Sequence, residues 1–216
     1  YNIVAAKVMN ECEIDLNELR TTINKIQGDQ NPFVLKYLSE ETFDHNAIIL
    51  MDYANLQNLD MLIETKKDIP IQIIRAVMRQ TLEGLSLIHE KGIIHGNIKG
   101  QNILLHCPTG SVRVIVKIAD IGILQAHKQP VTQTKRENAL TVTYMPPEVV
   151  IGNDEQNTAS DDKIDVWSFG ILLHQLVFHR FPFRSTNLNS ILMFMFSKKL
   201  ERPPKMKDDV LWDLLT

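Results

Sequence analysis

The stretch that decides the fold runs from residue 94 to residue 105 and reads Ile94-His95-Gly96-Asn97-Ile98-Lys99-Gly100-Gln101-Asn102-Ile103-Leu104-Leu105. Apolar residues at its two ends, Ile93-Ile94 and Ile103-Leu104-Leu105, predict short strands on either side of a polar loop. Further along the chain, Val114 to Ile118 predicts another short strand, which leads into Ala119-Asp120-Ile121-Gly122. Two polar segments, each next to a buried strand, therefore carry the candidate functional residues.

The segments before this loop predict several strands and two helices. Val, Ile and Ala dominate residues 1–9, which predicts a buried strand, and apolar residues at spacings of three and four predict helices over 16–26 and 70–90. Residues 33–38 and 47–51 predict two more strands, with a turn at 44–46. Residues 164–178 predict a helix that is buried on most sides, and 210–215 begin another. Strands followed by helices indicate an α+β chain in two lobes, with a boundary near residues 52–55.

Composition excludes several classes of function. The 216 residues are 44% hydrophobic and 23% charged, which is ordinary globular composition, and the net charge of −3 gives no reason to expect nucleic acid or an anionic membrane as partner. No apolar run reaches the roughly 18 residues that span a bilayer, and no signal peptide opens the chain. Two cysteines, Cys12 and Cys107, cannot form a disulfide framework, so we expect a reducing, cytoplasmic setting.

These segments resemble the eukaryotic protein kinases of Ser/Thr type. The 94–105 stretch is similar to the catalytic loop H-R-D-L-x-x-x-N, and Asp120 with Gly122 is similar to the D-F-G motif. Four further segments resemble the V-A-I-K strand, the hinge, the A-P-E segment and the buried helix behind the catalytic loop: Val4-Ala5-Ala6-Lys7, Met51-Asp52-Tyr53-Ala54, Tyr144-Met145-Pro146-Pro147-Glu148 and Asp165-Val166-Trp167-Ser168-Phe169-Gly170. Each motif is weak alone, but together they follow the order of the family across nearly the whole chain.

The resemblance implies a two-lobed fold that binds ATP and Mg²⁺ and acts on, or with, an unidentified protein partner. It implies that Lys7 holds the nucleotide phosphates and pairs with Glu18, although the apolar spacing would put Leu19 at that position. It implies metal binding by Asn102 and Asp120, and neutralisation of the transferred phosphate by Lys99. It also implies that Asp165 orients the loop backbone, that His95 is a packed core residue, and that the nucleotide contacts Ala5, Met51, Asp52, Ala54 and Leu104.

Three departures from the family pattern bear on catalysis. Asn97 stands where the family has the aspartate that accepts the substrate's proton, and an amide cannot take up a proton at neutral pH. Gly96 replaces an arginine that would hold an activation-loop phosphate, and Ile121 replaces a phenylalanine. No G-x-G-x-x-G occurs among the nine glycines, so we expect residues 1–54 to form a partial N-lobe and residues 55–216 a C-lobe that is truncated at its end.

Three functions remain open at this point. The chain is a nucleotide-binding pseudokinase that works as a scaffold or regulator, an active but unusual Ser/Thr kinase, or a fragment without a complete nucleotide site. Asn97 and Gly96 favour the first over the second. Nucleotide binding is favoured over the third by the retained Lys7, Lys99, Asn102 and Asp120. We also expect the polar, aperiodic segment 125–139 to be the least ordered internal region.

Overall fold

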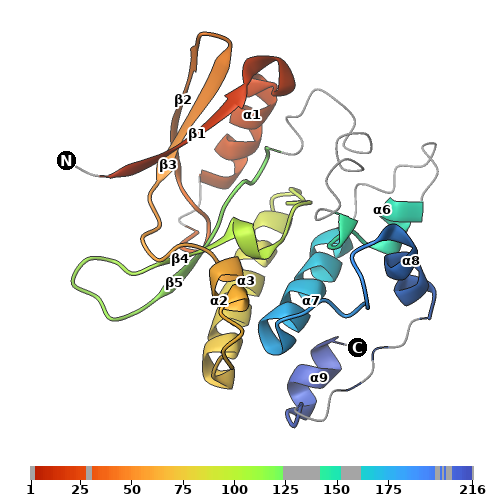
Figure 1. The fold of residues 1–216 in the computed structure, drawn as a ribbon. Coiled ribbons are helices and arrows are strands. Elements are labelled where there is room, and N and C mark those ends of the chain that lie inside the picture. The colour runs from red at the N-terminus through yellow and green to blue at the C-terminus, as the bar shows by residue number, and fades with distance from the viewer. Residues whose placement is uncertain are drawn as a thin grey trace.

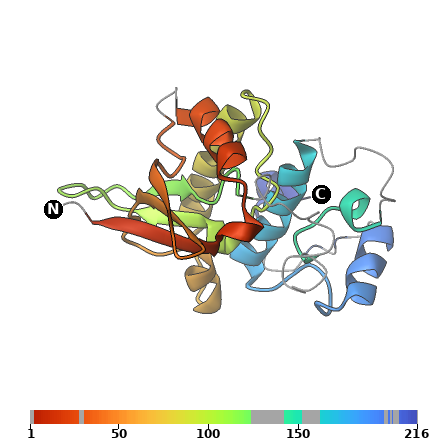
Figure 2. The ribbon, with the colours of Figure 1, turned by 90° about the horizontal axis from the view of Figure 1, so that it is seen from above.

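The protein's fold is known from a computed structural model, which describes residues 3–27, 31–123, 142–151, 162–197, 200, 202 and 206–215. A small antiparallel sheet and one helix form one end of the molecule, and a larger, mainly helical part forms the other (Figure 1). Figure 2 shows the same division from above, with the sheet on one side and α7 and α8 on the other. The predicted α+β class, with a small β-rich part and a larger helical part, is confirmed.

The sheet contains β1 (Val4–Asn10), β2 (Tyr37–Phe43) and β3 (Asn46–Asp52) in the order β1-β3-β2. Asp44 and His45 join β2 to β3 with φ values of 46° and 65°. Positive φ at both central residues is typical of the two-residue turn that matches the twist of a hairpin, so the predicted turn is confirmed. Helix α1 (Leu16–Gln27) buries Leu19 and Ile23 in the same apolar cluster as β3.

The larger part contains a two-stranded ribbon and most of the helices. The ribbon pairs β4 (Ile103–His106) with β5 (Ile115–Ile118). It also contains the 3-10 turn η2 (Gly100–Asn102) and the helices α2 (Leu59–Glu64), α3 (Ile71–His89), α6 (Pro147–Ile151), α7 (Lys163–Phe178), α8 (Leu188–Ser197) and α9 (Asp209–Leu215). A further 3-10 turn, η1 (Glu11–Glu13), joins β1 to α1 in the small part.

Helix α7 is the centre of this part. It is apolar over most of its circumference, and α2, α3 and α9 all contact it (Figure 1). Ten of its side chains are buried, including the charged Asp165. A buried carboxylate is costly unless it accepts hydrogen bonds, so the start of α7 is a place where a specific polar arrangement must exist.

One predicted strand is displaced and another is absent. Residues 33–36 lie outside the sheet, with Val34 and Leu35 buried and Lys36 exposed, and the strand begins only at Tyr37, because the backbone at Phe33 and Leu35 bonds to Ile118 of β5 instead of to the sheet. Residues 93 and 94 are irregular as well. The short helices α2, α6 and α8 were not predicted from the sequence. Segment 125–139 lies outside the described residues, and within those residues no helix is long and apolar enough to cross a bilayer.

Candidate active site

The site is built where β1 meets the segment after β5. Ala5, Lys7 and Met9 lie on one face of β1 because side chains alternate along a strand. From that face the Lys7 Nζ reaches the Asp120 Oδ2 at 2.6 Å, which joins residues 113 positions apart. Both side chains keep partial solvent access, 32% for Lys7 and 20% for Asp120. A cation and an anion that chain topology brings together in this way are accessible to a charged ligand.

The expected pair of Lys7 with Glu18 is not present in the structure. Glu18 is exposed on α1, and within the described residues the salt bridge of Lys7 goes to Asp120. The next residue, Leu19, faces inward and is 1% exposed. A shift of one residue in the helix register therefore separates the exposed Glu18 from the buried position.

Asp120 is held in an uncommon backbone conformation. Its φ is +66°, a region that residues other than glycine adopt at some energetic cost. On one side the Ala119 N–H donates to the Asn102 carbonyl at 2.9 Å, and on the other the buried Tyr37 hydroxyl donates to the Ile121 carbonyl at 3.1 Å. Burial, and to a smaller degree the charge of Asp120, raise the pKa of Tyr37, which keeps that hydroxyl a donor.

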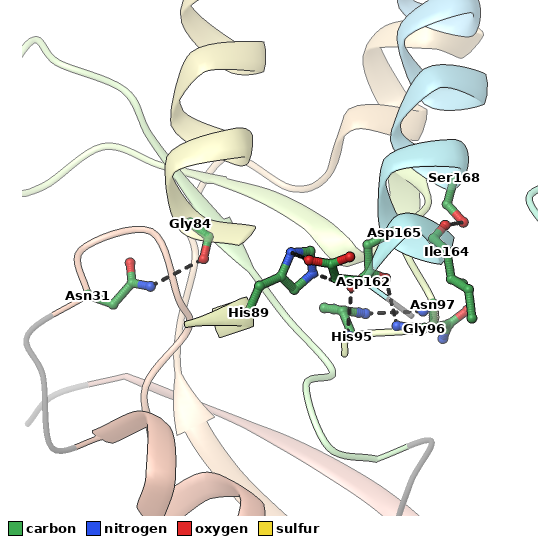
Figure 3. A network of polar contacts seen from close by, with 10 residues as sticks. All are labelled: Asn31, Gly84, His89, His95, Gly96, Asn97, Asp162, Ile164, Asp165 and Ser168. Atoms are coloured by element: carbon green, nitrogen blue, oxygen red, sulfur yellow. Dashed lines mark hydrogen bonds and ion pairs between the residues drawn. The ribbon is translucent and has the colours of Figure 1, made fainter. Parts of the chain in front are cut away.

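Asp165 anchors the 94–105 loop by its backbone, as predicted. Its Oδ2 accepts from the His95 N–H at 2.8 Å and from His89 Nε2 at 2.8 Å, and its Oδ1 accepts from the Gly96 N–H at 2.7 Å (Figure 3). Burial by itself would raise the pKa of Asp165, but the hydrogen bond from His89 and those from the backbone N–H groups of His95 and Gly96 contribute to lowering it on balance. The carboxylate is therefore an anion that fixes two consecutive peptide groups.

His95 links this loop to Asp120. The ring is fully buried, and the Asn97 N–H donates to its Nδ1 at 3.2 Å while its Nε2 lies 2.8 Å from the Ala119 carbonyl. A nitrogen that accepts carries no proton, so we assign the neutral tautomer with hydrogen on Nε2, which then donates to Ala119. Burial lowers the pKa of His95, in agreement with a neutral ring. The predicted packed core histidine is confirmed, and it connects the two polar segments.

The remaining polar residues of the loop face the same region. Asn102 Nδ2 donates to the Asn97 carbonyl at 2.8 Å, so the other atom of that amide is an oxygen of the kind that binds Mg²⁺. Burial lowers the pKa of Lys99, while the charge of Asp120 favours its protonated form. Lys7 also acts on Lys99, as a like charge. Two lysines, one carboxylate and one amide thus form a cluster, and Asp60 acts on Lys99 as a second opposite charge.

An apolar cluster adjoins these charges. Ala5, Ala54 and Leu104 pack against the cluster that contains Met51, and Ala5 lies opposite Met51 in the β1–β3 register. These four residues are the ones expected to contact the flat part of the nucleotide. Asp52, expected with them, donates its N–H to the Lys36 carbonyl at 2.9 Å. Sequence reasoning missed Tyr37 and His89, since a lone Tyr in a strand and a lone His at a helix end carry no pattern.

Comparison with known proteins supplies an independent view of the same residues. The sequence model of the family described as "Protein kinase domain" matches residues 1–213. The serine/threonine-protein kinase pakH of Dictyostelium discoideum is 33% identical over 199 residues, which cover 92% of this chain and 36% of that protein.

Two further relatives have similar coverage. The human serine/threonine-protein kinase ULK3 is 28% identical over 188 residues, covering 87% of this chain and 37% of that protein. The serine/threonine-protein kinase cst-1 of Caenorhabditis elegans is 30% identical over 203 residues, covering 93% of this chain and 38% of that protein. The chain therefore spans little more than a third of the length of these relatives.

Proposed function

The chain belongs to the protein kinase family, with Ser/Thr kinases among its relatives, and we propose that it is a catalytically impaired domain that binds ATP with Mg²⁺ and works as a scaffold or regulator. The two free thiols, Cys12 and Cys107, suit a reducing compartment such as the cytoplasm. We also propose that residues 1–54 and 55–216 act as the two lobes, with the hinge at residues 52–55.

The observation that carries this proposal is the side chain at position 97. The loop around it has a neutral His95, a buried anionic Asp165 and a positioned Asn102, yet the residue at its centre is an amide. Transfer of a phosphoryl group to a hydroxyl requires that the hydroxyl proton be accepted, and the loss of a general base lowers the rate by about 10²–10⁴-fold. An intact frame with a missing base favours a protein that binds nucleotide but turns it over poorly.

Nucleotide and metal have suitable groups in this site. The apolar cluster of Ala5, Met51, Ala54 and Leu104 offers a surface for a flat base, and Lys7 and Lys99 offer positive charge for phosphates. Asp120 and Asn102 offer a carboxylate and an amide oxygen, the donors that Mg²⁺ takes together with phosphate oxygens. When bound, the metal would neutralise phosphate charge. Lys7 would then exchange its contact with Asp120 for one with the phosphates.

One alternative has an observation in its favour. Phosphoryl transfer depends mainly on positioning and charge stabilisation, and Lys7, Lys99, Asn102 and Asp120 supply both. A slow but active Ser/Thr kinase that transfers the γ-phosphate to protein hydroxyls is therefore the second candidate.

The test combines binding and turnover. We expect ATP with Mg²⁺ to raise the melting temperature, because a ligand that binds the folded state stabilises it, and we expect Lys7→Met and Asp120→Asn to abolish that rise. We expect Asn97→Asp to increase phosphorylation of a basic protein substrate by about 10²-fold, the scale of an added general base.

Two results contradict the proposal in different ways. Unmodified protein that turns over at about 1–100 per second, an ordinary kinase rate, would establish the active-kinase alternative. Absence of any ATP-dependent shift would favour a chain without a complete nucleotide site.

A further inference from the structure

A hollow lies away from the Lys7–Asp120 site, between α3 and the start of α7. Its volume is about 440 Å³, and its apolar floor is formed by Leu82, Leu85 and Val166. Val166 is 55% exposed, a large value for a branched apolar side chain on the most buried helix of the protein. The polar side of the hollow carries His89, Glu90 and Asp162.

The charges of the hollow favour a cation. Glu90 and Asp162 are exposed carboxylates at its edge, and they come from different helices. Among the described residues that line the hollow, His89 is the one basic group, and its Nε2 is directed to Asp165 at 2.8 Å, with Asp162 at 4.0 Å from its Nδ1 (Figure 3). An anion entering here would meet two carboxylates, whereas a cation would meet two partners of opposite charge.

We propose that this hollow is a docking site for an arginine side chain carried by a segment of a partner protein. The methylene stem of arginine fits the apolar floor, since long cationic side chains cover apolar surface with their stems. Its planar guanidinium has five donors and can face carboxylates on two sides at once, which a lysine ammonium does less well. The hollow does not overlap the nucleotide site, because none of its lining residues belongs to the Lys7–Asp120 region.

A ligand in this hollow would lie next to His89, which is hydrogen-bonded to Asp165, the residue that anchors the 94–105 loop. His89 bonds Asp165, Asp165 holds the N–H groups of His95 and Gly96, and the His95 ring bonds the carbonyl of Ala119, next to Asp120. A guanidinium beside Asp162 repels a protonated His89, so it favours the neutral ring. By linkage, arginine must bind more tightly when His89 is neutral, and its binding must lower the pKa of His89 by the same factor.

The groups that face His89 set its pKa, and they therefore set the pH dependence of arginine binding. Hydrogen bonding to Asp165 raises the pKa of His89, burial opposes this, and the charges of Asp165 and Asp162 add to the rise. Glu90, directly after α3, and Asp162, directly before α7, are the other charged residues among the described residues that line the hollow. Binding of arginine should consequently strengthen as the pH rises through the pKa of His89.

The test is a titration followed by NMR of the histidine rings, with the peptide Ac-Leu-Arg-NH₂ as probe. A matched peptide with citrulline in place of arginine has nearly the same shape without the charge. We expect the arginine peptide to shift the His89 resonances and lower the pKa of His89, and we expect the citrulline peptide to do neither. Glu90→Gln and Asp162→Asn should each weaken binding by about two- to fivefold, the scale of one exposed ion pair.

Other outcomes overturn the proposal. Equal binding of the two peptides would show that charge does not select the ligand. Binding that survives Glu90→Gln combined with Asp162→Asn, or shifts that avoid His89 and Val166, would place the arginine elsewhere. Because both carboxylates are exposed, these variants should fold, and the citrulline comparison requires no variant at all.

Discussion

Replacement of the buried Asp165 by asparagine should be among the most damaging conservative changes in the chain. The carboxylate is 0% exposed and accepts three hydrogen bonds, from His89, His95 and Gly96. An amide has one oxygen, so its best orientation keeps two of these bonds and turns an NH₂ group toward the third donor. The unsatisfied donor costs about 1–3 kcal/mol, and the two retained bonds lose their ionic strengthening.

The sum of these effects is about 3–5 kcal/mol, in line with the cost of removing one partner from a buried charged pair. Because the free energy of unfolding of a domain is only about 5–15 kcal/mol, this loss is large. At about 2–4 °C per kcal/mol for a chain of this size, we expect the melting temperature to fall by roughly 6–20 °C. Urea unfolding and calorimetry of the two proteins measure the difference directly.

The pH dependence of this difference has a definite sign. The pKa of Asp165 lies below its ordinary value, so its contribution to stability is present above the unfolded pKa and is lost as the pH falls through the folded pKa. The pKa of His89 is raised, so its contribution is present below the unfolded pKa and is lost as the pH rises through the folded pKa. The advantage of the native protein over Asp165→Asn should therefore shrink from mildly acidic to alkaline pH.

Asp162→Asn is the matched control. It changes a carboxylate on the same helix start that is 59% exposed and makes no capping hydrogen bond, so its effect should stay within about 0.5 kcal/mol. If Asp165→Asn is no more damaging than this control, or if its effect does not change with pH, the assigned role of the carboxylate is wrong.

Two glycines give further predictions. A methyl group on Gly100 would lie 1.9 Å from Asp60 Oδ1 and 3.0 Å from the Asp60 backbone nitrogen. Gly100→Ala should therefore lower the free energy of unfolding by about 1–3 kcal/mol. In urea unfolding, a double-mutant cycle with Asp60→Ala should show a coupling energy above about 0.5 kcal/mol. In an exposed helix, Gly84→Ala would raise the free energy of unfolding by about 1 kcal/mol. Here the new methyl group would lie 2.7 Å from Ile118 Cδ1, so thermal melts should show a lower melting temperature. A higher melting temperature would refute the close packing of α3 on β5.

Much of the fold and of the central site follows from sequence because the motifs fix the ends of elements. Apolar residues end the 94–105 stretch and precede the segment 119–122, and the structure pairs these two apolar runs as β4 and β5. This pairing brings the polar residues before β4 next to those after β5. Asn102 then bonds both segments, because its Nδ2 donates to the Asn97 carbonyl and its own carbonyl accepts from the Ala119 N–H. The same logic failed for residues 33–36, because burial against β5 and membership of a strand give the same apolar pattern.

Other features could not be derived from the sequence. Glu18 and Leu19 differ by about 100° around a helix, so an uncertain register reverses which of them is buried and which is exposed. His89 gives no signal at all, since its partner Asp165 is 76 residues away and only the packing of α3 on α7 brings them together. The left-handed backbone of Asp120 is likewise a tertiary effect, because it depends on contacts of Ala119 and Ile121 rather than on local preference.

The loop geometry also explains why Asn97→Asp is a test of chemistry and not of folding. Asn97 takes part in the anchoring of the loop through its backbone: its N–H donates to His95 Nδ1 and its carbonyl accepts from Asn102. The groups that hold this backbone in place, Asp165 and His95, do not act on the amide of the side chain. Exchange of that amide for a carboxylate of the same shape therefore keeps these backbone contacts, while it adds a negative charge and the ability to accept a proton. A change in turnover without a change in stability would follow from this separation, whereas a loss of stability in Asn97→Asp would mean that the loop had adapted to an uncharged residue at its centre.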